Sequence, residues 1–148
     1  MTLVDKTAQA QSESLSFEFD LHHSPAKVWR ALTDPVLLAE WLLPVVDLQL
    51  EPGSAFTFKA QPQPGWDGNV NCRFLESEAQ RKLSYTWVVG DMEIDTVVTF
   101  TLTPTASGTR LSLVQSGFKP TQKQNFGGAR YGWTMMGSKL FDLLEGMS

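Results

Sequence analysis

Residues 126–147, "FGGARYGWTMMGSKLFDLLEGM", decide the fold. At helical spacing the apolar side chains of this segment form one stripe that runs from Phe126 to Met147. Glycines interrupt the pattern, mostly in its first half: Gly127, Gly128, Gly132 and Gly137. Each glycine inside a helix costs about 1 kcal/mol relative to alanine. The segment therefore predicts one long helix with a bulky second half and a weakened first half.

The glycines of this helix allow two interpretations. In the first, they alternate with large residues such as Tyr131, Trp133 and Met136 and leave room for a cavity above a sheet. In the second, they let the helix backbone approach the sheet closely, since glycine has no side chain to keep the two apart. The sequence alone leaves both interpretations open.

Two short helices are predicted near the start of the chain. The segment "LSFEFDL" (15–21) alternates apolar and polar residues as a half-buried strand does. Ser24 and Pro25 then provide a helix cap and a first helical residue. Asp34 with the following proline repeats this start signal, and Pro44 ends the second helix. The order is therefore strand, helix, helix.

The middle of the chain reads as strands joined by short turns. Apolar residues alternate along six further segments, which are 46–50, 56–58, 70–74, 83–89, 94–102 and 111–113. Such a series is typical of an antiparallel sheet with one buried face. One helix of about 10–12 Å diameter cannot cover a flat sheet of that width. We therefore expect an α+β fold in which a curved antiparallel sheet of six to seven strands wraps around the long C-terminal helix.

Length and composition indicate a single domain. We expect it over residues 14–148, after a flexible polar leader over residues 1–13, and a chain of 148 residues can bury a sizeable core. The net charge of −4 argues against a nucleic-acid partner. No segment has the length and hydropathy of a membrane span. Cys72 is the only cysteine, which excludes an intrachain disulfide and fits a cytoplasmic protein.

Polar residues show no pattern typical of catalysis or metal binding. His22 and His23 are neighbours on a predicted strand end, so their side chains point apart. Cys72 lies between apolar residues and is expected in the core. The carboxylates at 91, 93 and 95 lack the spacing of a calcium loop and are expected at a solvated rim. We therefore predict no catalytic residue, no metal and no cofactor.

Aromatic side chains are the clearest signal of a binding site. They make up 11% of the chain and include five tryptophans, more than one helix can cover evenly. A cavity with aromatic walls and a few polar groups is typical of a site for small apolar molecules. Trp66 is a candidate for a lid, and Arg130 for a contact with an anionic group. The predicted ligand-binding residues are Trp41, Phe56, Phe58, Trp66, Phe74, Tyr85, Trp87, Phe100, Arg130, Trp133 and Met136.

One stretch of the chain carries a family resemblance. "SPAKVWRALTDPVLLAEWLLP" (24–44) resembles the START-like (SRPBCC) superfamily, and within it the family related to the activators of the heat-shock-protein-90 ATPase. Further matches are "LSYTW" (83–87), "SGTRLSLVQSGF" (107–118) and Gly132-Trp133, so the resemblance covers about residues 14–146. It implies the helix-grip fold. The chain differs from its relatives at Pro52-Gly53 and at Arg130-Tyr131. With 148 residues, we expect no room for the additional N-terminal domain of the eukaryotic activators.

Three functions follow as hypotheses. The first is non-enzymatic binding of a small hydrophobic or amphipathic molecule, such as a lipid, a sterol or an aromatic compound, between the sheet and the last helix. The resemblance implies the same. The second is a protein-interaction regulator related to a chaperone or a stress response. The third is an enzyme of the aromatase/cyclase type, for which Tyr85, Arg130 and Tyr131 are the residues to test. The absence of an evident acid–base pair favours binding over catalysis.

Overall fold

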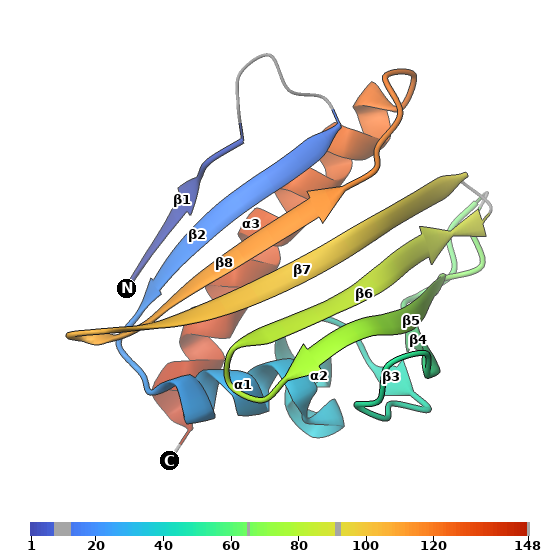
Figure 1. Ribbon diagram of the computed structural model, residues 1–148. Helices are drawn as coiled ribbons and strands as arrows, with labels where there is room; N and C mark the ends of the chain where they lie inside the picture. The colour runs from blue at the N-terminus through green and yellow to red at the C-terminus, as the bar shows by residue number, and fades with distance from the viewer. Residues whose placement is uncertain (8–12, 65, 91–92, 148) are drawn as a thin grey trace.

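The fold is an eight-stranded antiparallel sheet curved around one long helix (Figure 1). The computed structural model describes residues 1–7, 13–64, 66–90 and 93–147. The helices are α1 (Pro25–Thr33), α2 (Pro35–Trp41) and α3 (Lys123–Gly146). The strands are β1 (Thr2–Asp5), β2 (Ser14–Leu21), β3 (Val45–Val46), β4 (Ala55–Lys59), β5 (Asn69–Glu78), β6 (Lys82–Val89), β7 (Ile94–Thr105) and β8 (Gly108–Ser116). The predicted α+β architecture is confirmed.

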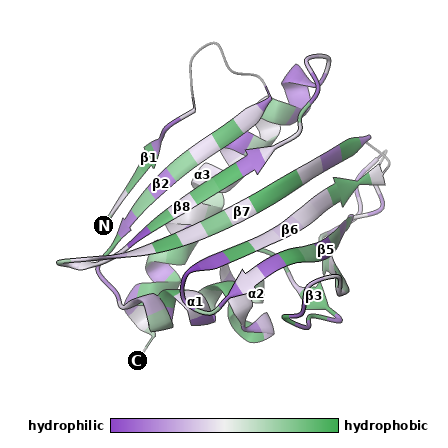
Figure 2. Ribbon diagram, viewed as in Figure 1, coloured by the Kyte–Doolittle hydropathy of each residue, from purple (hydrophilic) through white to green (hydrophobic). Residues whose placement is uncertain are grey.

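The strand order is β1-β2-β8-β7-β6-β5-β4-β3. The predicted alternation is confirmed in β2, where Leu15, Phe17, Phe19 and Leu21 are all buried. The same period appears as bands of colour along β7 and β8 in Figure 2. The buried face of the sheet packs against α3 and the two short helices, so the core lies between the sheet and these three helices. No helix of the described ranges is long and apolar enough to cross a membrane.

The first residues of the chain differ from the expected leader. Residues Thr2–Asp5 form β1, which pairs with β2 at the edge of the sheet. The side chain of Leu3 is half-buried against the core. Four residues are too few to show an alternation in sequence, and the pairing depends on β2 lying alongside. The sheet therefore has eight strands rather than six to seven, and residues 8–12 lie outside the described ranges.

The two short helices begin where the capping residues predict. Ser24 Oγ accepts a hydrogen bond from Lys27 N at 3.3 Å, and Asp34 Oδ1 accepts one from Val36 N at 2.9 Å. Trp41, at the end of α2, donates its indole N–H to Ala31 O of α1 at 2.8 Å. This bond fixes the two helices against each other below one end of the sheet (Figure 1).

The glycines of α3 have different surroundings. A Cβ at Gly137 would lie 3.0 Å from the ring of Phe19 and 3.1 Å from a methyl group of Leu3. Gly137 therefore serves the close approach of helix and sheet. A Cβ at Gly127 or Gly128 would have no heavy atom within 4 Å, and one at Gly132 would meet only Met136 Cε, at 3.8 Å. Close packing thus explains one of these glycines, and open space surrounds the others.

Candidate functional site

Most of the predicted ligand-binding aromatics form one packed cluster. Their neighbouring ring centroids are 4.5–6.2 Å apart, and each ring is almost fully buried. The cluster comprises Phe56, Phe58, Phe74, Tyr85 and Phe100. Trp41 of α2 joins it through an edge contact with Phe100 at 6.5 Å. These rings contact one another and hold the β4–β7 half of the sheet against α2.

Beside this cluster lies a small apolar pocket. Its volume is about 130 Å³, and its walls are Leu43, Trp66, Val70, Trp87 and Val89. The walls come from the segment after α2, from the β4–β5 loop and from the neighbouring strands β5 and β6. All five side chains are apolar or aromatic. Two of them, Trp66 and Trp87, are among the residues that the sequence predicted for ligand binding.

Trp66 is held at the pocket by its own loop. Its indole N–H donates to Asn69 O at 3.0 Å, and its backbone exchanges two hydrogen bonds with Gln63, both 2.9 Å long. Gly68 has φ +88°, and a Cβ there would lie 2.4 Å from Ala60 O. Only glycine fits this close approach. The loop thus folds inward and presents the tryptophan to the pocket.

Trp87 is held in place by two ring contacts and by one hydrogen bond to its backbone. Its ring packs against Phe58 with centroids 5.4 Å apart and against Trp133 of α3 with centroids 5.5 Å apart. Its backbone carbonyl accepts a hydrogen bond from Thr96 Oγ1 at 2.9 Å. The pocket wall is therefore positioned by β7 and α3 as well as by β6.

A buried polar chain continues from this carbonyl to the long helix. Gln115 Nε2 donates to Thr96 Oγ1 at 3.0 Å, and Trp133 Nε1 donates to Gln115 Oε1 at 2.7 Å. Gln115 and Thr96 are 2% and 1% exposed. The sequence analysis missed both residues. Their signal was present, because Gln115 takes the inward position after Leu111 and Leu113 on an alternating strand.

Arg130 and Met136 take different positions on α3. The guanidinium of Arg130 pairs with the carboxylate of Asp5 on β1, at the opposite edge of the sheet from β3. Arg130 thus does not lie beside the pocket. Met136 is half-buried against the core and lies one turn after Trp133. Its unbranched side chain is more flexible than the indole of Trp133.

Two titratable side chains of the core, Cys72 and Tyr85, are held neutral. Burial raises the pKa of the Cys72 thiol far above its ordinary value of 9.0. Burial, with a smaller contribution from the neighbouring Cys72, raises the pKa of Tyr85 well above 10.0. Tyr131 is 69% exposed. The enzyme hypothesis requires Tyr85, Arg130 and Tyr131 to lie together. The structure does not bring them together.

Histidines and carboxylates form no metal site within the described ranges. His22 is exposed and lies 3.8 Å from Asp20 Oδ2. His23 is mostly buried, with Nδ1 3.1 Å from Lys27 Nζ and Nε2 3.5 Å from Glu145 Oε1. Lys27 Nζ also donates to Met147 O at 2.9 Å, so this group ties α1 to the end of α3. Of the predicted carboxylate rim, Glu93 and Asp95 are exposed and residue 91 lies outside the described ranges.

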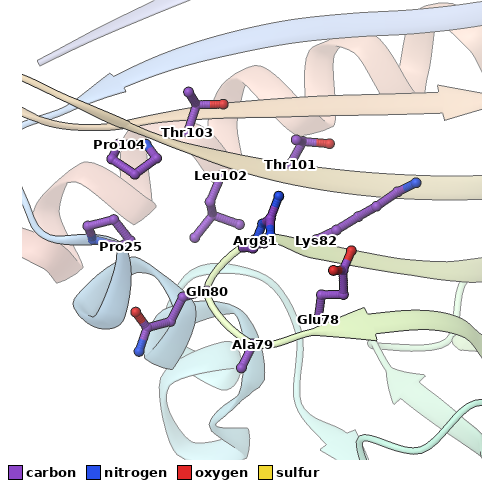
Figure 3. A pocket seen from close by; sticks show the side chains of 10 residues that line it. All are labelled: Pro25, Glu78, Ala79, Gln80, Arg81, Lys82, Thr101, Leu102, Thr103 and Pro104. Atoms are coloured by element: carbon purple, nitrogen blue, oxygen red, sulfur yellow. The ribbon is translucent and has the colours of Figure 1, made fainter.

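Two larger hollows lie on the surface and have charged side chains among their walls. A groove of about 690 Å³ runs beside the β5–β6 turn, the end of β7 and the start of α1 (Figure 3). Its charged side chains are Glu78, Arg81 and Lys82, of which Lys82 pairs with Glu76 at 3.1 Å. A second hollow of about 380 Å³ lies between Glu40 of α2 and Lys139 of α3. None of the eleven predicted ligand-binding residues lines either hollow.

This chain matches one family profile and is similar to several proteins of known structure. The profile described as "Activator of Hsp90 ATPase homolog 1-like protein" matches residues 22–145. Protein MLL2253 from Mesorhizobium loti is 40% identical with a TM-score of 0.84, over 91% of this chain and 98% of that chain. Protein CV1439 from Chromobacterium violaceum is 28% identical with a TM-score of 0.75, over 91% and 99% of the two chains. No protein with a curated description matches the sequence.

Proposed function

Since the chain belongs to the family of Activator of Hsp90 ATPase homolog 1-like proteins, whose fold is the helix grip, we propose that it binds a small apolar molecule in the pocket between Trp66 and Trp87. The observation that carries the proposal is the composition of the walls. Five apolar or aromatic side chains surround one depression, and aromatic packing fixes one of the two tryptophans. Such surfaces gain free energy when an apolar ligand displaces water.

The volume of the pocket limits what enters it. Pockets for drug-sized ligands span about 300–1,000 Å³. A dry cavity of about 150 Å³ holds a benzene ring. A volume of about 130 Å³ therefore fits one ring or a short alkyl chain of a ligand.

A larger ligand needs more room along α3. Met136 is unbranched and flexible, and Gly132, its neighbour on the preceding turn, has no side chain. A shift of Met136 toward Gly132 would make room on the helix side of the core, between sheet and helix, where the sequence predicts the ligand.

A thermal-shift screen with sterols, flavonoids, aromatic polyketides and fatty acids tests the proposal. A ligand at ten times its Kd stabilises the native state by about 1.4 kcal/mol, or about 3–6 °C in Tm at this chain length. Val89→Phe fills the pocket and should abolish the shift. Val114→Phe adds the same bulk on the outer face of β8 and should retain it.

The screen also separates this function from its rival. A ligand that shifts Tm equally in wild type and in Val89→Phe binds elsewhere and contradicts the proposed site. Absence of any shift, together with co-purification of a chaperone, would favour the regulator function instead.

A further inference from the structure

The strand β1 occupies a slot between the edge of β2 and the helix α3. Its backbone pairs with β2 along all four of its residues, of which Leu3 is the one that is partly buried. A Cβ at Gly137 of α3 would lie 3.1 Å from a methyl group of Leu3 and 3.0 Å from the ring of Phe19. The missing side chain of Gly137 therefore makes room for the slot, and Leu3 fills it.

Two side chains of β1 fit features of the slot. Leu3 and Asp5 point to the same side of the strand, because side chains alternate along it. Leu3 lies in the apolar space beside Gly137, and the carboxylate of Asp5 pairs with the guanidinium of Arg130 on the same helix. The slot therefore fits an extended segment that carries a leucine and, two positions later, an aspartate.

Few other contacts hold β1 in this place. Thr2, Val4 and Asp5 are exposed, with Val4 at 48%. The strand is the outermost one of the sheet, so it has a neighbouring strand on one side only. Terminal segments with few buried contacts open at a free energy well below that of global unfolding. We therefore expect β1 to leave the slot without unfolding of the core.

We propose that the slot accepts the N-terminal strand of a second copy of this chain, so that two molecules exchange β1. A second copy offers the same sequence, Thr-Leu-Val-Asp, and the structure shows that this sequence fits the slot. Exchange replaces each contact of β1 by the identical contact in the other molecule. Its cost is the freedom that two molecules lose on association, so the extent of exchange rises with protein concentration.

A mixture of two cysteine variants tests the exchange. Thr2→Cys and Asp20→Cys place the new thiols at positions that face each other across β1 and β2. Facing residues of antiparallel strands have Cα atoms about 4.5–5.5 Å apart, a separation that a disulfide spans. After mild oxidation, mass spectrometry identifies the disulfide that joins the two variants. The native Cys72 is buried and should not compete.

A second mixture is the matched control. It contains Thr101→Cys in place of Asp20→Cys, because Thr101 is exposed on β7 and does not face β1. The disulfide between positions 2 and 20 should form several-fold more than the control disulfide, and its yield should rise with concentration. Adding Leu3→Asn to the Thr2→Cys variant should remove this excess. Equal yields in the two mixtures would overturn the inference.

A labelled peptide with the sequence of residues 1–7 distinguishes a second copy from another protein as the source of the strand. It should bind full-length Leu3→Asn protein, whose own β1 fits the slot poorly, more tightly than it binds the wild type. The same peptide with asparagine in place of leucine should not bind. Peptide binding without exchange between copies would overturn the second copy as the occupant and indicate a strand of another protein. Failure of the peptide to bind the variant would overturn the strand-accepting slot itself.

Discussion

Gln115 joins three strands and the long helix through a buried amide. Its oxygen accepts from Trp133 of α3, and its nitrogen donates to Thr96 of β7, which in turn donates to the β6 carbonyl of Trp87. Each bond contributes modestly when made, but a buried group left without a partner costs about 1–3 kcal/mol. Loss of the amide is therefore expected to cost more free energy, through the buried donor that it leaves unpaired, than its hydrogen bonds contribute when they are made.

Replacement of this amide should destabilise the protein. Gln115→Leu leaves Trp133 Nε1–H without its acceptor, and we expect the free energy of unfolding to fall by about 2–3 kcal/mol in urea denaturation. Gln49→Leu, at an exposed loop position, is the matched control and should change stability little. Adding Trp133→Phe to Gln115→Leu removes the orphaned donor as well. A double variant no more stable than the sum of the single changes would contradict this account.

At the scale of the element, α3 combines one glycine that contacts the sheet with others that do not. Gly137 faces Phe19 of β2 and Leu3 of β1, whereas Gly128 faces open space. The same substitution should therefore have opposite effects at the two positions. This contrast separates the helix propensity of glycine from its role in packing.

Gly128→Ala should stabilise the protein by about 0.5–1 kcal/mol, because alanine is the better helix former and its methyl group meets no neighbour. Gly137→Ala should destabilise it by about 1 kcal/mol, since the new methyl group must displace a ring at 3.0 Å and a methyl group at 3.1 Å. Chemical denaturation of both variants measures the difference. If both changes stabilised the protein, β1 and the ring of Phe19 would move aside for the new methyl group at position 137 without a cost in free energy, which would contradict this prediction.

At the scale of the whole molecule, the ion pair of Asp5 and Arg130 joins the first strand to the last helix. Burial on its own raises the pKa of Asp5. Hydrogen bonds from Thr7 and Arg130, with the charge of Arg130, outweigh it and hold the pKa below its ordinary value of 3.8. A carboxyl with a lowered pKa in the folded state stabilises that state fully above its unfolded pKa. The contribution is lost as the pH falls through the folded pKa.

Asp5→Asn should therefore lower Tm at pH 7, and the difference should shrink as the pH falls through the lowered pKa of Asp5, where the wild-type carboxyl becomes protonated too. Thermal melts of both proteins between pH 2.5 and 7 test this, with Asp20→Asn as a control at a carboxylate on the neighbouring strand that does not contact α3. A constant difference in Tm across that range would mean that the charge of Asp5 has no part in holding β1.

The sequence determined the features that depend on neighbours along the chain. The strand period, the caps Ser24 and Asp34 and the long apolar stripe of α3 are local signals, and together they specified an α+β fold with a curved sheet. The family followed from motifs that cover the same elements. Local signals also identified Trp66 and Trp87 as binding candidates, because large aromatics in a loop and on a buried strand exceed what a core needs.

Only the tertiary structure decided how these residues divide between core and pocket. Phe56, Phe74 and Phe100 have the same pattern in sequence as Trp87, but sheet curvature packs them together and leaves the pocket beside β6. The pairing of Arg130 with Asp5 joins residues 125 positions apart, and the partner of a charge so distant has no local signal. Open space and contact across the sheet are properties of how elements meet. The sequence pattern shows on which face of a helix or strand a residue lies. It does not show which residue of another element packs against that face.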